Sequence, residues 1–225
     1  MNITPLQNWL PFKDYFVIAG PCSAETEEQV LNTAHSLKKT DKVKLFRAGI
    51  WKPRTRPNTF EGVGKRGLKW LQRVKQETGL KTCTEVASPS HIKDALDHGI
   101  DVLWIGARTT VNPFLVQEMA NYLKGKDIPV MIKNPINADL SLWIGAIERF
   151  YNAGIKKIIG IHRGFSTSRP SPYRNEPLWK IPVEIRQKIP TLPIVCDPSH
   201  IAGSRYKIQE LAQKAFDLAM DGLMI

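Results

Sequence analysis

Eight short apolar segments alternate with stretches of helical periodicity along almost the whole of this 225-residue chain. The apolar segments, which we expect to be strands, are 16–19, 43–46, 80–84, 102–105, 129–132, 157–161, 193–196 and 222–225. The expected helices are 26–39, 64–78, 89–98, 113–123, 140–152, 183–188 and 206–220. Strands that alternate with helices lie parallel in one sheet, because each helix carries the chain back to the edge where the next strand starts.

The number of strands distinguishes the two common parallel architectures. Eight strands favour a closed (β/α)8 TIM barrel over a doubly wound sheet, and no Gly-x-Gly-x-x-Gly sequence follows the first strand. We therefore expect one catalytic domain over residues 1–225, in which residues 1–15 are an N-terminal extension. Because the eighth strand is the last segment, the barrel is predicted to be truncated after it and to lack its eighth helix. We expect this chain to be a fragment of a longer protein. Alternatively, a partner or the N-terminal segment covers the exposed outer faces of the strands.

Cationic residues gather at the ends of the expected strands. They are Arg47, Lys52, Arg54, Arg108, Lys133 and Arg163. Like charges repel at short range, so a folded protein crowds them where anions bind. The active site of a parallel barrel forms at the carboxyl ends of its strands. The pattern therefore predicts one site for a phosphorylated or carboxylated small molecule.

Carboxylates and metal-ligating residues occupy equivalent positions. Cys22 follows the first strand, Glu85 the third, and Asp197 and His200 the seventh. A thiolate and an imidazole suit transition metals, so Cys22 and His200 are predicted to form half of a divalent metal site. Such a metal polarises a carbonyl group or activates a water molecule. Each residue alone has an ordinary structural explanation, but their shared placement favours a site.

Composition excludes several classes of protein. The formal net charge is +11, but the lysines form only short clusters such as Lys38-Lys39, so we expect no nucleic-acid partner. No apolar run is long enough to span a membrane, and residues 1–11 lack the features of a signal peptide. Three widely spaced cysteines do not form a disulfide framework, which indicates a cytoplasmic location.

Seven short motifs occur in order on successive strands, and together they resemble a known enzyme family. They are Ala19–Ser23 (AGPCS), Arg47–Thr55 (RxxxxKPRT), Thr84-Glu85, Ile105–Thr110 (IGARTT), Ile132–Asn134 (IKN), His162–Gly164 (HRG) and Asp197–His200 (DPSH). The family is 3-deoxy-D-arabino-heptulosonate 7-phosphate (DAHP) synthase, in the short barrel lineage shared with 3-deoxy-octulosonate 8-phosphate (KDO8P) synthase. The resemblance runs from about Phe16 to the end of the chain.

The resemblance implies an aldol-type condensation of phosphoenolpyruvate (PEP) with erythrose 4-phosphate, the first step of the shikimate pathway to the aromatic amino acids. It implies that Arg47, Arg108, Lys133 and Arg163 hold PEP, and it places Asp197 with the substrate-binding residues. Lys52 would lie between the two substrates, Arg54 and Thr55 would bind the sugar phosphate, and Glu85 would lie near the attacking water. Lys52, Glu85 and His200 are thus the expected catalytic residues.

The resemblance also implies a divalent metal ion, either Mn, Fe, Zn or Co, bound by Cys22 and His200. Two further ligands of the family, a Glu after the eighth strand and an Asp in the next loop, have no counterpart before Ile225. Lys133-Asn134-Pro135 also departs from the usual Gly in that loop. We expect a homo-oligomer, and a lost C-terminal domain such as chorismate mutase remains open.

Four alternatives stay open, and one of them is an inactive scaffold, which truncation would produce. KDO8P synthase would use arabinose 5-phosphate, although the Lys-Pro-Arg-Thr motif resembles the heptulosonate enzymes and Cys22 stands where metal-free octulosonate enzymes carry Asn. A Schiff-base aldolase would use Lys133 or Lys52 as its amine nucleophile. A non-catalytic barrel that binds phosphate or nucleic acid would bind without turnover.

Overall fold

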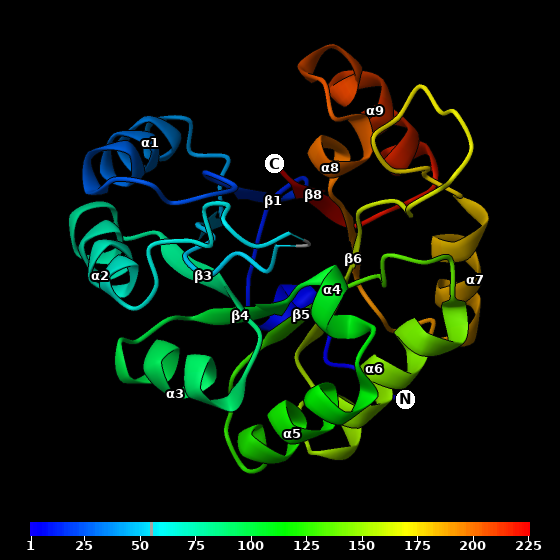
Figure 1. Ribbon diagram of the computed structural model, residues 1–225, viewed down its shortest axis with the longest axis horizontal. Coiled ribbons are helices and arrows are strands. Elements are labelled where there is room, and N and C mark those ends of the chain that lie inside the picture. The colour runs from blue at the N-terminus through cyan, green and yellow to red at the C-terminus, as the bar shows by residue number, and fades with distance from the viewer. Residues whose placement is uncertain (55) are drawn as a thin grey trace.

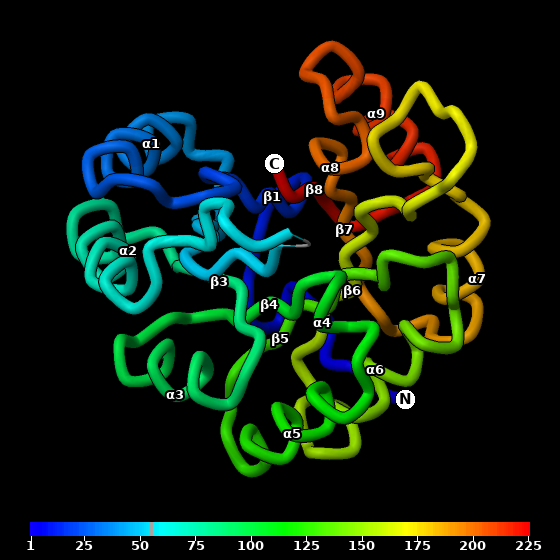
Figure 2. The backbone as a smooth tube through the Cα atoms, in the orientation of Figure 1, coloured from blue at the N-terminus to red at the C-terminus, as the bar shows by residue number. Residues whose placement is uncertain are grey.

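The strands close into a barrel with helices around it (Figures 1 and 2). The computed structural model describes residues 1–54 and 56–225. In this part of the chain, eight parallel strands form one closed barrel, and each strand pairs with the next from β1 to β8. The predicted (β/α)8 fold is therefore confirmed. None of the described helices combines the length and the apolar character needed to cross a bilayer.

The strands are short and almost entirely buried, because the barrel interior covers one face and helices cover the other. They are β1 Phe16–Ala19, β2 Leu45–Arg47, β3 Lys81–Val86, β4 Val102–Ile105, β5 Val130–Lys133, β6 Ile158–His162, β7 Ile194–Cys196 and β8 Gly222–Met224. Four strands run further than the apolar pattern predicts: β2 ends at Arg47, β3 at Val86, β5 at Lys133 and β6 at His162. Strands β3 and β6 illustrate this. Glu85 pairs with Trp104, and His162 pairs with Cys196. Backbone pairing continues past the apolar run in both cases, so these polar residues belong to strands.

The helices follow the predicted order. They are α1 Glu27–Lys39, α2 Arg66–Thr78, α3 Pro89–Asp97, α4 Ala107–Thr110, α5 Pro113–Leu123, α6 Leu140–Asn152, α7 Lys180–Lys188, α8 Pro198–Ala202 and α9 Ile208–Asp217, with 3-10 turns η1 Leu6–Asn8 and η2 Arg205–Lys207. Side-chain caps fix several of the starts. Ser88 accepts a hydrogen bond from the backbone of His91, and Asn112 accepts one from Leu115, each ahead of a proline at the first helical position.

Two short helices, α4 and α8, are absent from the sequence-based prediction. They contain 4 and 5 residues, which is too few for a helical period to be visible. Each follows a strand directly, α4 after β4 and α8 after β7. Arg108 lies on α4 and His200 lies on α8, so these turns hold two site residues over the mouth of the barrel.

The core has two layers. Inside the barrel, buried side chains from all eight strands pack together, with Phe16, Trp104 and Met131 among them. A second layer fills the space between the strands and the surrounding helices. The N-terminal extension contributes Leu6 and Leu10 to the interior layer. The extension therefore covers the amino ends of the strands, opposite the expected site.

The barrel closes where β8 pairs with β1. Gly222 lies opposite Phe16, and a Cβ atom at Gly222 would lie 1.9 Å from the carbonyl oxygen of Phe16. Only glycine allows this close approach. In Figure 1, β1 and β8 lie between α1 on one side and α8 and α9 on the other. Val17 on β1 and Leu223 on β8 are half-buried.

Candidate active site

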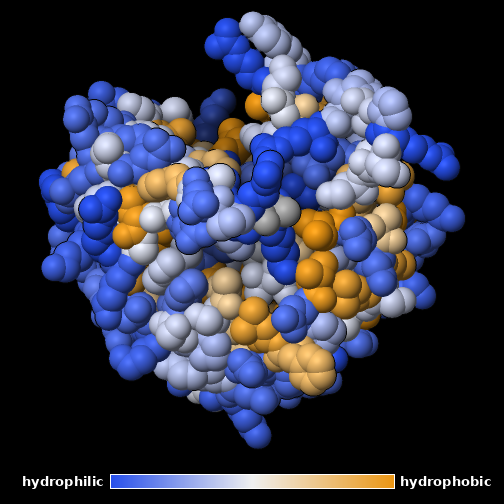
Figure 3. All heavy atoms as spheres, in the orientation of Figure 1, coloured by the Kyte–Doolittle hydropathy of each residue, from blue (hydrophilic) through white to orange (hydrophobic). Residues whose placement is uncertain are grey.

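A cavity of about 260 Å³ opens at the carboxyl ends of the strands. It brings together eight of the predicted site residues, namely Cys22, Lys52, Arg54, Glu85, Arg108, Lys133, Arg163 and His200. Ser23, Pro53, Gly106, Ala107, Ile136, Ser166, Arg174 and Asn175 complete the described wall. Figure 3 shows hydrophilic side chains gathered around the centre of this face. Among the described wall residues, cations outnumber carboxylates, so the cavity is suited to anions.

Two predicted residues that the structure describes, Arg47 and Asp197, do not line the cavity. Arg47 is 3% exposed and its Nε donates to the carbonyl oxygen of Gly20, 3.1 Å away. Asp197 is fully buried behind the wall. Thr55 lies outside the described residues. Arg47 and Asp197 therefore act on the cavity through their charge and their neighbours.

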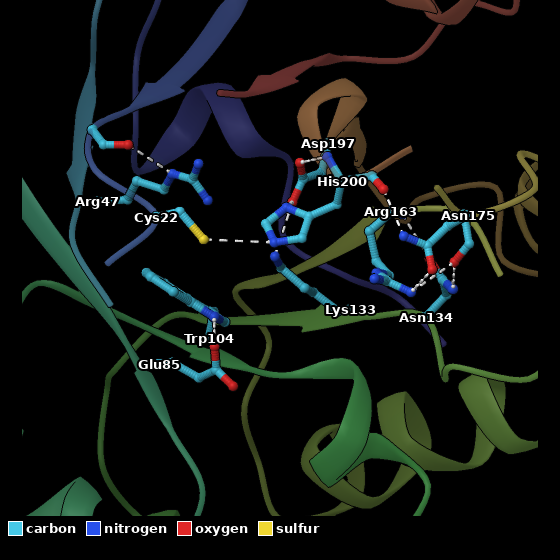
Figure 4. Close-up of polar contacts among 12 residues, drawn as sticks. Cys22, Arg47, Glu85, Trp104, Lys133, Asn134, Arg163, Asn175, Asp197 and His200 are labelled. Atoms are coloured by element: carbon cyan, nitrogen blue, oxygen red, sulfur yellow. Dashed lines mark hydrogen bonds and ion pairs between the residues drawn. The ribbon is translucent and has the colours of Figure 1, made fainter. Parts of the chain in front are cut away.

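Cys22 and His200 approach each other across the cavity, although 178 positions separate them in the sequence (Figure 4). The Sγ atom of Cys22 lies 3.6 Å from Nε2 of His200 and 3.4 Å from Nζ of Lys52. Burial raises the pKa of the thiol, but the hydrogen bond with His200 and the charges of Lys52, His200 and Arg47 outweigh burial and lower the pKa to about 6. The side chain is thus mainly a thiolate at neutral pH.

Asp197 joins the two sides of the site (Figure 4). Its Oδ2 atom lies 2.9 Å from Nζ of Lys133 and 2.7 Å from Nδ1 of His200, and its Oδ1 accepts from the backbone of His200. Burial alone would raise the pKa of Asp197, but the positive charges of Lys133, His200 and Arg47 hold it well below its usual range. The carboxylate therefore orients the His200 ring, with Nε2 directed to Cys22.

These features fit a transition metal. A thiolate and an imidazole nitrogen are ligands of suitable softness, and the second nitrogen of His200 faces a carboxylate, as in many metal-binding histidines. The described residues contain no cluster of three or more ligating side chains. Among the described residues, Cys22 and His200 are a pair that could hold such an ion.

Glu85 is held by a residue that the sequence analysis did not identify. The indole Nε1 of Trp104 donates to Oε2 of Glu85 over 3.0 Å, inside the barrel. Gly106 makes room for the other oxygen, because a Cβ atom there would lie 2.1 Å from Oε1 of Glu85. In the sequence, Trp104 is part of an apolar run that predicts a strand. The hydrophobic pattern therefore could not reveal its hydrogen bond to Glu85.

Arg163 is fixed by two asparagines (Figure 4). Its backbone N–H donates to Oδ1 of Asn134 over 2.7 Å, and its Nη1 donates to Oδ1 of Asn175 over 2.9 Å. Asn134 follows Lys133 within a quoted motif, whereas Asn175 lies in the irregular segment between β6 and α7. In the sequence, only the length of that irregular segment indicated that it contains a site residue, since long loops are often functional.

The loop after β2 is fastened at three points. The backbone of Lys52 donates to the carbonyl oxygen of Glu61 over 2.8 Å, and Nε of Arg54 donates to that of Phe60 over 2.7 Å. The ring of Trp51 stacks on that of His91 at 4.1 Å and 5°. Lys52 and Arg54 are therefore held at the rim by backbone contacts and by packing against α3.

Comparison with known proteins identifies the relatives of this chain. Residues 13–225 match the model of the DAHP synthetase I family. Phospho-2-dehydro-3-deoxyheptonate aldolase of Thermotoga maritima is 32% identical over 94% of this chain, and the chain spans 60% of that relative's length. A 2-dehydro-3-deoxyphosphooctonate aldolase of Nitratidesulfovibrio vulgaris is 26% identical over 93% of this chain and 80% of its own length.

Solved structures give the same result. The crystal structure of the Thermotoga maritima DAHP synthase superposes with a TM-score of 0.81 at 31% identity, covering 94% of this chain and 59% of that one. A truncated form of the same synthase gives 0.79 at 30% identity, covering 94% of this chain and 74% of that one.

Proposed function

Because this chain belongs to the DAHP synthetase I family, we propose that it condenses PEP with erythrose 4-phosphate and releases inorganic phosphate. The observation that carries the proposal is the cavity itself, whose wall holds both a set of cations and the Cys22–His200 pair. Two anionic substrates repel each other, so their approach requires an excess of positive charge in a confined pocket.

PEP occupies the inner part of the cavity in this proposal. Arg108, Lys133 and Arg163 bind its phosphoryl group and carboxylate, since guanidinium groups pair with both oxyanions through two hydrogen bonds. Arg47 contributes its charge from behind the wall. The sugar phosphate lies at the rim, with Arg54 and Thr55.

The reaction forms a bond from carbon three of PEP to the aldehyde carbon of the sugar. Water adds to carbon two, and phosphate leaves with the bridging oxygen. Lys52 lies near the aldehyde oxygen, where it donates a proton to the developing alkoxide. Glu85 accepts a proton from the water. A divalent metal held by Cys22 and His200 would supply Lewis-acid polarisation of the aldehyde.

The sugar substrate distinguishes this proposal from KDO8P synthase. The heptulosonate relative is more similar to the chain than the octulosonate relative, at 32% against 26% identity. A test supplies PEP and Mn²⁺ with either erythrose 4-phosphate or arabinose 5-phosphate and follows PEP consumption. We expect consumption with the four-carbon sugar. Consumption with only the five-carbon sugar, or with neither sugar, contradicts the proposal.

A Schiff-base mechanism has less support. The ammonium of Lys133 is buried against Asp197 at 2.9 Å, and an ion-paired ammonium is a poor nucleophile. Borohydride added during turnover traps a covalent adduct only if a lysine forms an imine. We expect no adduct by mass spectrometry.

The three free cysteines support a reducing cytoplasm as the location.

The two substrates are expected to depend on different arginines. Arg163→Ala should raise KM for PEP about 10- to 100-fold, because it removes charge-assisted hydrogen bonds. It should change KM for erythrose 4-phosphate much less, and Arg54→Ala should show the opposite pattern. Initial rates with each substrate varied in turn measure both constants. Equal effects on both substrates would remove these assignments.

Gly106→Ala should slow the reaction without unfolding the protein. The added methyl group displaces the end of the flexible Glu85 side chain and breaks its hydrogen bond to Trp104. We expect kcat to fall about 100-fold, as for other misplaced catalytic groups, with little change in melting temperature. Gly145→Ala is the matched control, because its Cβ atom would meet no neighbour within 4 Å. Equal kcat values in the two variants would show that the position of Glu85 is unimportant.

A further inference from the structure

Arg174 lines the cavity but belongs to none of the seven motifs. It lies in the segment between β6 and α7, beside Asn175, which also lines the cavity. Its side chain is exposed. No hydrogen bond or ion pair of its guanidinium group is found among residues 1–54 and 56–225. The charge of Arg174 is therefore available to a ligand.

The position of Arg174 is set by its neighbour Asn175, which is 5% exposed. The side chain of Asn175 accepts a hydrogen bond from Nη1 of Arg163 over 2.9 Å and donates one to the carbonyl oxygen of His200 over 2.6 Å. Its backbone N–H donates to the carbonyl oxygen of Ile201 over 3.2 Å. The segment that carries Arg174 is thus tied to the loops after β6 and β7, whose residues form the site.

The stem of Arg174 is also packed. It lies over Gly203, at the end of α8, where an added Cβ atom would be 2.6 Å from Cβ of Arg174 and 3.4 Å from its Cδ. Gly203 has a φ of +67°, so a larger residue is disfavoured there on conformational grounds as well. The contact thus restricts the stem of a side chain that lines the cavity.

Electrostatics places Arg174 beside the inner cations. Burial lowers the pKa of Arg163 to about 10, the nearby charges of Arg108 and Arg174 lower it as well, and Asp197 opposes them. Arg163 still carries its charge at neutral pH. Three guanidinium groups that repel one another are stabilised by a bound dianion, and a phosphoryl group supplies one.

We propose that Arg174 is a further substrate-binding residue, which binds the phosphoryl group of PEP together with Arg108 and Arg163. This inference rests on the proposed function. Arg174 belongs to the segment tied to Arg163, whereas Arg54 lies on the separate loop after β2. The phosphoryl group of PEP, and not that of the sugar, is therefore its partner.

The test measures binding by calorimetry on the whole chain, without the sugar. The probes are PEP, inorganic phosphate, and pyruvate, which has the carboxylate but lacks the phosphoryl group. Arg174→Ala should weaken PEP and phosphate about tenfold, because one charge-assisted contact at an exposed position is lost. It should leave pyruvate binding unchanged, and Arg174→Lys should restore part of the affinity. Arg169→Ala is the matched control, since Arg169 is exposed on the same segment but does not line the cavity.

Each result bears on one of the two proposals. The inference is overturned if Arg174→Ala binds PEP and phosphate as tightly as Arg169→Ala does. It is also overturned if Arg174→Ala loses as much affinity for pyruvate as for PEP. Initial rates give a further check: if Arg174→Ala raises KM for erythrose 4-phosphate and not for PEP, the inference is overturned, because Arg174 would then bind the sugar. If the parent binds phosphate through Arg174 but never consumes PEP, the inference holds and the proposed function fails. If the parent turns over and Arg174→Ala matches the control, the proposed function holds and the inference fails.

Discussion

Asp197→Asn is expected to lower the free energy of unfolding by about 3–5 kcal/mol, because it leaves the ammonium of Lys133 buried without its partner. Asp197 is fully buried, and its Oδ2 lies 2.9 Å from Nζ of Lys133 and 2.7 Å from Nδ1 of His200. Asparagine has nearly the same size, and its oxygen can still accept from the backbone of His200. The change thus isolates the charge. Urea unfolding at pH 7, followed by circular dichroism, measures the effect.

An exposed ion pair provides the matched control. Lys93 and Asp97 approach to 2.6 Å on the surface of α3, with side chains 62% and 52% exposed. Asp97→Asn should change the free energy of unfolding far less than Asp197→Asn does, because solvent screens such pairs. Similar losses in the two variants would mean that the buried pair contributes no more than a surface pair.

The stabilisation by Asp197 should also depend on pH. Its pKa in the folded protein is held well below the usual range, mainly by Lys133 and then His200 against the opposing effect of burial. A group with a depressed folded-state pKa stabilises fully above its unfolded pKa of about 3.9, and this contribution is lost as the pH falls through the folded value. The difference between the parent and Asp197→Asn should therefore narrow below pH 4.

Cys22→Ala is expected to reduce metal affinity about 100-fold or more and to abolish metal-dependent consumption of PEP. The substitution removes one of the two donors that face each other at 3.6 Å. Mutation of residues that only hydrogen-bond to metal ligands already lowers metal affinity about 10- to 100-fold. Titration with Co²⁺ gives a readout that is independent of activity, because a thiolate bound to cobalt has a charge-transfer absorption. We expect this absorption in the parent and not in the variant.

Cys83→Ala tests whether the effect is specific to Cys22. Cys83 is fully buried in the barrel interior, where burial raises the pKa of its thiol. This variant should lose some stability, as core truncations do, but should keep the absorption with Co²⁺. If the absorption persists in Cys22→Ala and disappears in Cys83→Ala, the predicted ligand is wrong.

The fold was accessible from local patterns. Strand 102–105 and helix 140–152 were predicted with the bounds that the structure shows, because an apolar run and a 3.6-residue period depend on nearby residues alone. The helix starts at Ser88 and Asn112 followed from a cap residue ahead of a proline. Patterns failed where a helix is too short to show a repeated period, as in α8, or where strand pairing continues through a polar residue such as Glu85.

The sequence by itself determined the barrel and the set of strand-end cations, because both depend on order and spacing along the chain. Only the tertiary structure decided which of these side chains meet. Asp197 lies 64 positions from Lys133, and Asn175 lies 25 positions from His200. Their contacts exist because barrel closure fixes the register of distant strands and brings their carboxyl ends to one edge. The same closure buries Asp197 among cations and sets Arg174 over the cavity, and no local pattern carries that information.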